Sequence, residues 1–251
     1  MVVTTPTTMS IPTTPVAPPA RYLALGDSYT IGESVPAAAR WPNRLVELLR
    51  AEGIAIAKPD IIARTGWTTD ELDAALDAAE RGEPVALADE EFAPVPAPPY
   101  QLVSLLIGVN NQYRGRPVDE YRAQLQRLIA RAIGYAGGRP RRVIVLSIPD
   151  WGVTPFAADE GRDASVVGAE IDACNAAKRA ECARAGVAYI DITPLTREAA
   201  TRRELLADDG LHPSAIDYQR WAQAALATAR MALEHQRNCT ISDFRSNATD
   251  E

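Results

Sequence analysis

The chain has 251 residues, of which 47% are hydrophobic and 24% charged, so it can bury a sizeable core. Its net charge is −7 and basic residues are interspersed with acidic ones, which excludes the basic stripe of a nucleic-acid-binding protein. No apolar run reaches the roughly 18–20 residues that cross a bilayer, and the N-terminus has no secretory signal pattern, so the default location is cytoplasmic. The cysteines Cys174, Cys182 and Cys239 have no metal-binding or redox spacing, and we expect no metal and no cofactor.

Apolar runs and helical periodicity alternate along the chain. In chain order they predict a strand at 22–25, a helix at 41–50, a strand at 54–62, a helix at 69–80, a strand at 102–107, a helix at 118–133, a strand at 143–148, a helix at 163–185, a strand at 187–192 and a helix at 214–234. Thr69 is the expected N-cap of the second helix. The apolar stripe of Tyr121, Leu125 and Leu128 is expected to face the core.

This alternation is typical of βαβ units. It predicts a single three-layer αβα domain around a five-stranded, mostly parallel sheet. We expect the domain to span residues 21–234, after a disordered leader rich in Thr and Pro at 1–20. The acidic, proline-rich segment 82–99 is expected to be a surface insertion, and residues 235–251 a loose polar tail.

Several polar residues and glycines directly follow predicted strands. Ser28 follows the first strand, Gly66 the second and Asn110 the third, while Asp209 and His212 lie in a polar turn after the fifth. Because the carboxyl ends of parallel strands share one edge of a sheet, we expect these residues to meet there.

These residue types suit nucleophilic catalysis. A serine hydroxyl needs a neutral imidazole to accept its proton, and the imidazole needs an acceptor on its other nitrogen. His212 is one of only two histidines and has Asp209 three residues before it, whereas His235 lies at the predicted end of the last helix. Backbone N–H groups at Ser28 and Gly66 and the Asn110 amide would bind an oxyanion. The structural alternatives are a helix-capping serine, an Asx turn and ordinary turn residues.

The blocks Gly26-Asp27-Ser28, Gly66, Gly108-Val109-Asn110 and Asp209-Gly210-Leu211-His212-Pro213 resemble, in this order, those of the GDSL/SGNH hydrolases. The resemblance covers residues 21–233. It implies a flavodoxin-like sheet and ester hydrolysis, with Ser28 as nucleophile, His212 as base and Asp209 as its orienter. It also implies an oxyanion hole made by Ser28, Gly66 and Asn110.

One departure is Asn111, where the family often has aspartate. The Gly-x-Ser-x-Gly motif of α/β-hydrolases is absent, since Tyr29 and Thr30 follow Ser28.

Aromatic and polar residues in the same predicted loops are candidates for the walls of a substrate pocket: Trp67, Asn111, Tyr113, Arg114 and Trp151. The expected partner is a small-molecule ester. The sequence leaves open a lysophospholipid, a thioester, an acetylated sugar or an aryl ester, and it predicts no oligomeric state. The alternatives to an esterase are an acyltransferase and a non-catalytic module that binds a glycan or an acyl group.

Overall fold

The computed structural model describes residues 17–88 and 91–246. Most of the expected leader, residues 1–16, lies outside the described residues, as does the end of the expected tail, 247–251. The last leader residue, Ala20, forms an isolated parallel bridge with Ile56. Ala20 therefore belongs to the folded body, which begins slightly earlier than the sequence predicts.

The main sheet has five parallel strands in the order β2-β1-β5-β6-β7, which confirms the predicted α/β class. The strands are β1 (Tyr22–Gly26), β2 (Asp60–Ala63), β5 (Leu102–Leu106), β6 (Val143–Leu146) and β7 (Ala188–Ile190). The chain first adds a strand on one side of β1 and then returns to build the other side. The strand order therefore reverses between β1 and β5, where doubly wound sheets bind their ligands.

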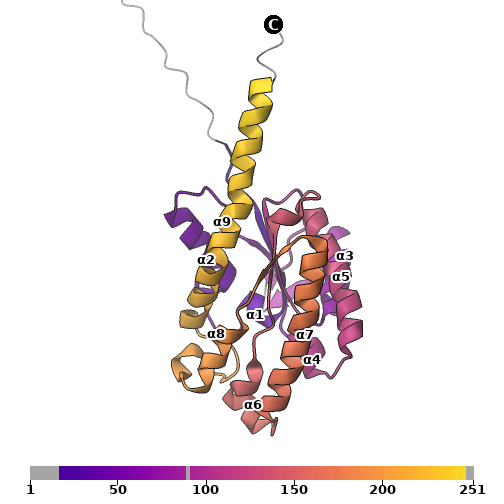
Figure 1. Cartoon of the computed structure of the whole chain (residues 1–251), viewed down its shortest axis with the longest axis vertical. Helices are drawn as coiled ribbons and strands as arrows, with labels where there is room; N and C mark the ends of the chain where they lie inside the picture. Colours follow the sequence, from indigo (N-terminus) through magenta and orange to yellow (C-terminus); the bar gives the residue numbers. More distant parts are fainter. Residues whose placement is uncertain (1–16, 89–90, 247–251) are drawn as a thin grey trace, which may run out of the picture.

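Helices cover both faces of this sheet, as Figure 1 shows. Helix α2 (Trp41–Ala51) packs on α9 (Ala215–Ser246) on one face. Helices α3 (Thr69–Glu80), α5 (Val118–Tyr135) and α7 (Ala164–Ala185) lie on the other. The sheet is thus the middle of three layers, and every residue of the central strands β1, β5 and β6 is buried. This double burial explains their nearly continuous apolar sequence.

Short elements connect these layers. They are α1 (Ser28–Ile31), η1 (Ala37–Ala39), α4 (Val109–Tyr113), η2 (Pro140–Arg142), η3 (Trp151–Val153), α6 (Pro155–Asp159), α8 (Thr193–Arg197), η4 (Glu198–Ala200) and η5 (Arg203–Leu205). The sequence predicts none of them, because each is too short to show a helical period.

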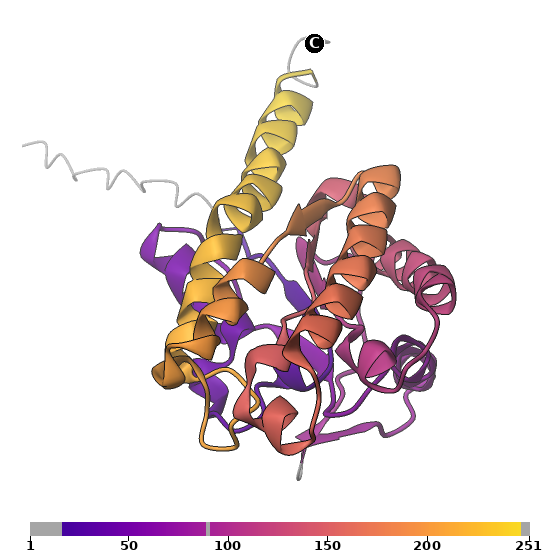
Figure 2. The ribbon, with the colours of Figure 1, turned by 60° about the horizontal axis from the view of Figure 1, so that its bottom comes forward.

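Helix ends follow capping chemistry, with one correction. The N-cap of α3 is Thr68 and not Thr69, since the Thr68 N–H bonds to Glu71 in a capping box. Helix α7 begins after Asp163, whose side chain accepts the N–H groups of Ser165 and Val166. Helix α9 continues to Ser246, beyond its predicted end at 234, and extends past the rest of the fold (Figure 2).

Two strand predictions also need correction. The strand predicted at 54–62 begins only at Asp60, because Pro59 directly precedes it and lacks a ladder donor. The segment 82–99 contains β3 (Ala86–Ala88) and β4 (Glu91–Phe92), which pair in a separate two-stranded antiparallel sheet that the sequence does not predict.

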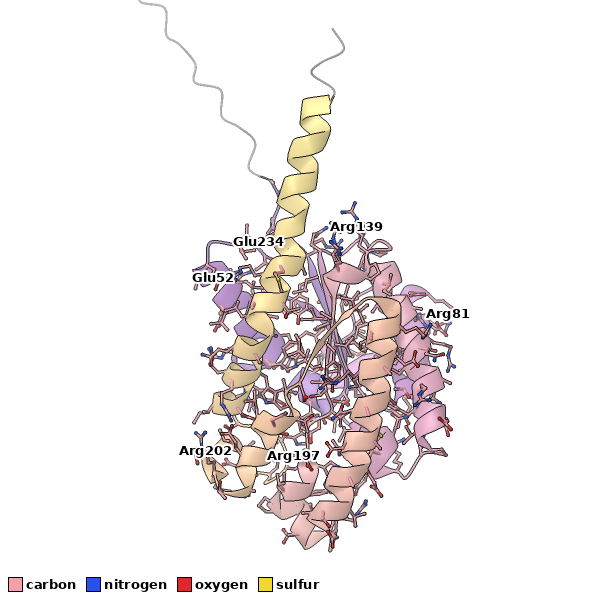
Figure 3. All side chains as sticks on the ribbon, in the orientation of Figure 1. Glu52, Arg81, Arg139, Arg197, Arg202 and Glu234 are labelled. Atoms are coloured by element: carbon pink, nitrogen blue, oxygen red, sulfur yellow. The ribbon has the colours of Figure 1, made fainter. Side chains whose placement is uncertain are left out.

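Charged side chains lie around the outside of the layers, for example Arg81 at the end of α3 and Glu52 at the end of α2 (Figure 3). Within the described residues, no helix has the length and apolarity to cross a membrane.

Candidate active site

Ser28 lies at the turn that follows β1. It is the first residue of α1, and Asp27 caps this helix by accepting the Tyr29 N–H at 3.1 Å through Oδ1. The turn is tight, since a Cβ on Gly26 would meet Thr30 and the Leu106 carbonyl. These contacts fix the Ser28 backbone, and the residue is 5% exposed.

Gly66 lies in the loop after β2, and Asn110 lies in the short helix α4 after β5; hydrogen bonds tie these two segments together. Asn110 Nδ2 donates to the Trp67 carbonyl at 2.9 Å, and the Arg114 guanidinium donates to the Gly66 carbonyl at 2.7 Å. Gly66 has φ of 85°, a conformation that favours glycine whatever the available space. An amide has two N–H groups, so Asn110 keeps a second donor.

Asp209 and His212 lie in one turn before α9. Asp209 Oδ1 accepts the backbone N–H groups of Leu211 and His212, each at 2.9 Å. Its Oδ2 lies 2.7 Å from His212 Nδ1 and also accepts the Ser34 hydroxyl at 2.6 Å. The Asx turn that the sequence allows is therefore present, and the same carboxylate contacts the imidazole.

The charge of Asp209 determines the tautomer of His212. Burial raises the pKa of Asp209, but hydrogen bonds from Ser34, Leu211 and His212 outweigh it and lower this pKa to about 2. The carboxylate is thus ionised at neutral pH and can only accept hydrogen bonds. Nδ1 of a neutral His212 must then carry the proton, which leaves the lone pair on Nε2.

A cavity of about 180 Å³ brings the predicted groups together. Ser28, Gly66, Asn110 and His212 all line it. The other lining residues are Tyr29, Thr65, Val109, Tyr113, Trp151, Phe156 and Leu211. A hydroxyl, an imidazole and candidate oxyanion donors therefore face one space, while Asp209 supports the imidazole from behind.

The structure separates the predicted wall residues into two groups. Tyr113 and Trp151 line the cavity, but Trp67, Asn111 and Arg114 do not. Asn111 is fully buried, accepts the Thr69 N–H at 3.0 Å and donates to the Thr69 hydroxyl. These bonds join α4 to the start of α3 and direct the Asn111 amide away from this cavity.

Sequence reasoning missed several neighbours of the site. The Tyr29 ring packs 5.3 Å from the His212 ring, and Phe156 and Leu211 add apolar wall. Only their positions in the sequence could have pointed to these two residues, since Tyr29 directly follows Ser28 and Leu211 directly precedes His212. Nothing in the sequence marks Ser34, which reaches Asp209 across 175 positions.

Two buried charges lie beside the nucleophile turn. Burial raises the pKa of Asp27 to about 7 and lowers that of Lys178 to about 8, while their opposite charges interact. Lys178 Nζ donates to the Leu146 carbonyl at 2.8 Å. Neither side chain lines the cavity, so both belong to the framework that carries Ser28.

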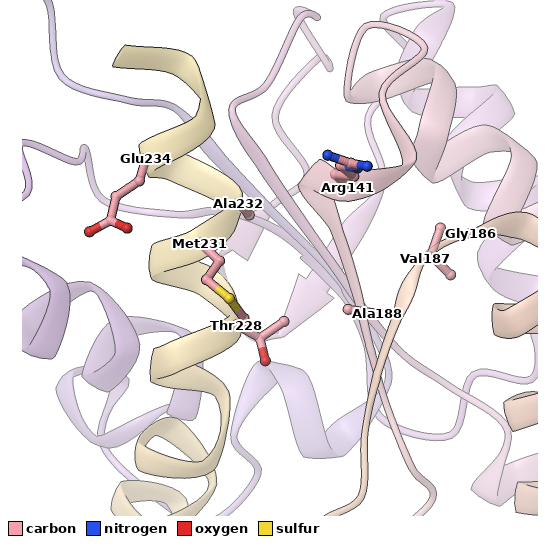
Figure 4. A pocket seen from close by; sticks show the side chains of 8 residues that line it. All are labelled: Arg141, Gly186, Val187, Ala188, Thr228, Met231, Ala232 and Glu234. Carbon is pink, nitrogen blue, oxygen red and sulfur yellow. The ribbon is translucent and has the colours of Figure 1, made fainter. Parts of the chain in front are cut away.

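A larger cavity of about 490 Å³ lies at the opposite edge of the sheet, between α9 and the start of β7 (Figure 4). Thr228 and Ala232 lie on one side, and Val187 and Ala188 on the other. This cavity contains neither histidine nor serine, so the smaller cavity is the candidate active site. Among the side chains that the structure describes, no cluster of His, Cys, Asp or Glu is arranged to hold a metal ion.

Comparison with known protein families identifies the family of this chain. Residues 24–220 match the GDSL-like lipase/acylhydrolase family. The chain belongs to this family. The match runs from within β1 to the first turns of α9 and includes every residue proposed from the sequence for the site. The protein is thus a GDSL-family hydrolase with the SGNH-hydrolase fold.

Solved structures of this fold are similar over most of the chain. A crystal structure of TesA has 18% identity and a TM-score of 0.61, with 85% of this chain and 99% of that chain covered. A lipase/acylhydrolase from Enterococcus faecalis has 18% identity and a TM-score of 0.57, with 85% and 95% covered. The acetylxylan esterase Axe2 from Geobacillus stearothermophilus has 18% identity and a TM-score of 0.55, with 84% and 94% covered. A search of the curated proteins found no match.

Proposed function

We propose that this GDSL-family protein hydrolyses a carboxylic ester through an acyl-enzyme formed on Ser28. One arrangement carries the proposal. Ser28 and His212 line the same cavity, and the 2.7 Å contact between Asp209 and Nδ1 leaves the Nε2 lone pair of His212 available as a base.

In the first step the Ser28 oxygen attacks the carbonyl carbon of the ester. Its proton passes to Nε2 of His212, because a hydroxyl is a weak nucleophile unless a base takes its proton. The imidazolium that forms is stabilised by the ionised Asp209 carboxylate. The low pKa of Asp209, about 2, keeps this charge in place across the neutral range.

The oxyanion of the tetrahedral intermediate needs hydrogen-bond donors. The Ser28 N–H is in the first turn of α1, where N–H groups have no partner within the helix. The Gly66 N–H and the second Nδ2 hydrogen of Asn110 complete the proposed set. Loss of one such donor costs about 10²–10³ in kcat.

The intermediate then breaks down. His212 returns its proton to the alcohol oxygen, the bond from the carbonyl carbon to that oxygen breaks, and the acyl group stays on Ser28. A water molecule attacks this acyl-enzyme with His212 again as base. The products are a carboxylic acid, an alcohol and the free Ser28 hydroxyl, so one water is consumed for each ester.

The test is the hydrolysis of p-nitrophenyl acetate by Ser28→Ala and Asn110→Ala. We expect Ser28→Ala to lower kcat by at least about 10³-fold, and Asn110→Ala by about 10²–10³-fold. Melting temperatures near that of the wild type would show that both variants fold. Activity of Ser28→Ala within a few-fold of the wild type would overturn the proposal, because the nucleophile would then be another group. Product analysis with a competing alcohol separates hydrolysis from acyl transfer.

A further inference from the structure

The walls of the cavity beside Ser28 are mostly apolar. Away from the reacting groups they consist of the polar Thr65 and of six residues with largely apolar side chains: Tyr29, Val109, Tyr113, Trp151, Phe156 and Leu211. The cavity volume of about 180 Å³ is below the roughly 300–1,000 Å³ typical of drug-sized ligands. Such a space admits a compact apolar group and has few partners for the hydroxyls of a sugar.

Three of these walls are aromatic rings in mutual contact. The Tyr113 and Trp151 ring centroids lie 5.2 Å apart at an interplanar angle of 67°, and those of Trp151 and Phe156 lie 6.1 Å apart at 62°. Tyr113 comes from α4 and Phe156 from α6, which lie at the same end of the molecule (Figure 1). Rings in edge-to-face arrangement favour a further ring over an aliphatic group of similar size.

Hydrogen bonds hold the central ring in place. The Trp151 indole N–H donates to Gln112 Oε1 at 2.7 Å, and Gln112 Nε2 donates to Glu170 at 2.6 Å. Trp151 is 2% exposed, so it forms a fixed wall.

The loop that carries Trp151 is anchored as well. Asp150 accepts the Gly152 N–H at 2.9 Å and the Arg197 Nε at 2.8 Å, and it is 4% exposed. This support preorganises the wall, which raises selectivity for a ligand of matching shape.

We infer that this cavity binds a compact aromatic ring of the substrate ester, next to the scissile carbonyl. The inference rests on the proposed esterase function and adds its substrate class. The ring belongs either to the acyl group, as in a benzoate ester, or to the alcohol, as in a phenyl ester. The same walls would recognise it in both cases.

The test compares an aromatic ester with its saturated counterpart in matched variants. One arm uses ethyl benzoate against ethyl cyclohexanecarboxylate, and the other uses phenyl acetate against cyclohexyl acetate. The aromatic-to-saturated ratio of kcat/KM is measured for the wild type, Phe156→Leu and Phe92→Leu. Phe92 is an exposed residue of β4 outside the cavity, so it controls for the substitution itself. Differences in intrinsic reactivity cancel when each variant's ratio is divided by that of the wild type.

We expect Phe156→Leu to lower the aromatic-to-saturated ratio by about two- to tenfold in one arm, and Phe92→Leu to leave it unchanged. The arm that responds identifies the acyl or the alcohol source of the ring. A second pair keeps the test valid if Phe156→Leu fails to fold: Trp151→Leu should lower the ratio, whereas Trp151→Phe retains a ring and should largely keep it.

The two proposals fail differently. Unchanged ratios in both arms, with normal turnover, would overturn the aromatic site and leave the esterase intact. No turnover of any of these esters, together with no labelling of Ser28 by a fluorophosphonate, would overturn the esterase itself.

Discussion

Ser34 combines an unfavourable backbone conformation with a contact to the proposed active site. Its φ of 63° lies in the left-handed region, and among the described residues it is the only non-glycine at positive φ. Its hydroxyl donates to Asp209 Oδ2 at 2.6 Å, the same oxygen that contacts His212. We therefore predict that Ser34→Ala and Ser34→Gly lower kcat equally but differ in stability.

The expected changes in kcat and stability follow from two contributions, the hydrogen bond to Asp209 and the left-handed backbone of Ser34. A hydrogen bond to a charged group contributes about 1.5–3 kcal/mol when buried, and we take about 1 kcal/mol because Ser34 is exposed. If this energy positions Asp209, its loss slows kcat by about fivefold. A left-handed conformation costs a residue with a Cβ about 1–2 kcal/mol. Ser34→Ala keeps this strain and loses the bond, so it should destabilise the fold by about 1 kcal/mol, whereas Ser34→Gly should be near neutral.

The assay is kcat and KM for p-nitrophenyl acetate beside urea unfolding of the three proteins. Equal losses of kcat with unequal stabilities would show that the hydroxyl acts on the reaction through Asp209. A Ser34→Gly variant with wild-type kcat would refute this reasoning, because this variant also lacks the hydroxyl that donates to Asp209.

Three further changes test other parts of the account. Asp209→Asn should lower kcat by up to about 10⁴-fold, because an amide permits the wrong His212 tautomer. Because the fold lowers the pKa of Asp209 from 3.8 to about 2, the wild type should also be more stable than this variant above pH 3.8 and lose that extra stability as the pH falls through about 2, measured by urea unfolding. Gly66→Ala should lower the free energy of unfolding by about 1–2 kcal/mol, because alanine is strained at this positive φ. It should also lower kcat, whereas a loop without a catalytic role would leave kcat unchanged. Burial lowers the pKa of Lys178 from 10.5 to about 8, so its contribution to stability is present at high pH and lost as the pH falls through 8. In urea unfolding, the free energy of unfolding of the wild type should therefore rise relative to that of Lys178→Met between pH 8 and pH 10. A difference that stays constant over this range would contradict the prediction.

The sequence predicts the sheet and the residues at its edge because both depend on local signals. Apolar runs identify the strands, and the alternation with helices implies parallel pairing, so Ser28, Gly66 and Asn110 follow neighbouring strands as expected. The Asp209 and His212 pair is also local, since a three-residue spacing allows their contact.

The rest of the site depends on contacts that no local pattern encodes. Ser34 meets Asp209 only because the fold brings the turn after α1 to the turn before α9. Asn111 follows Asn110 in sequence, but the helical turn of α4 directs it into the core toward Thr69. Phe156 joins the aromatic wall through α6, a helix too short to be recognised from its periodicity.

The most direct test of the central claim is the site of covalent labelling. The protein is treated with a fluorophosphonate, digested and analysed by peptide mass spectrometry, with Ser28→Ala and His212→Ala treated in parallel. We predict a single adduct on Ser28, no adduct in Ser28→Ala and much slower labelling in His212→Ala, because the imidazole activates the hydroxyl. An adduct on another residue, or labelling of Ser28 at the same rate without His212, would contradict the proposed nucleophile and base.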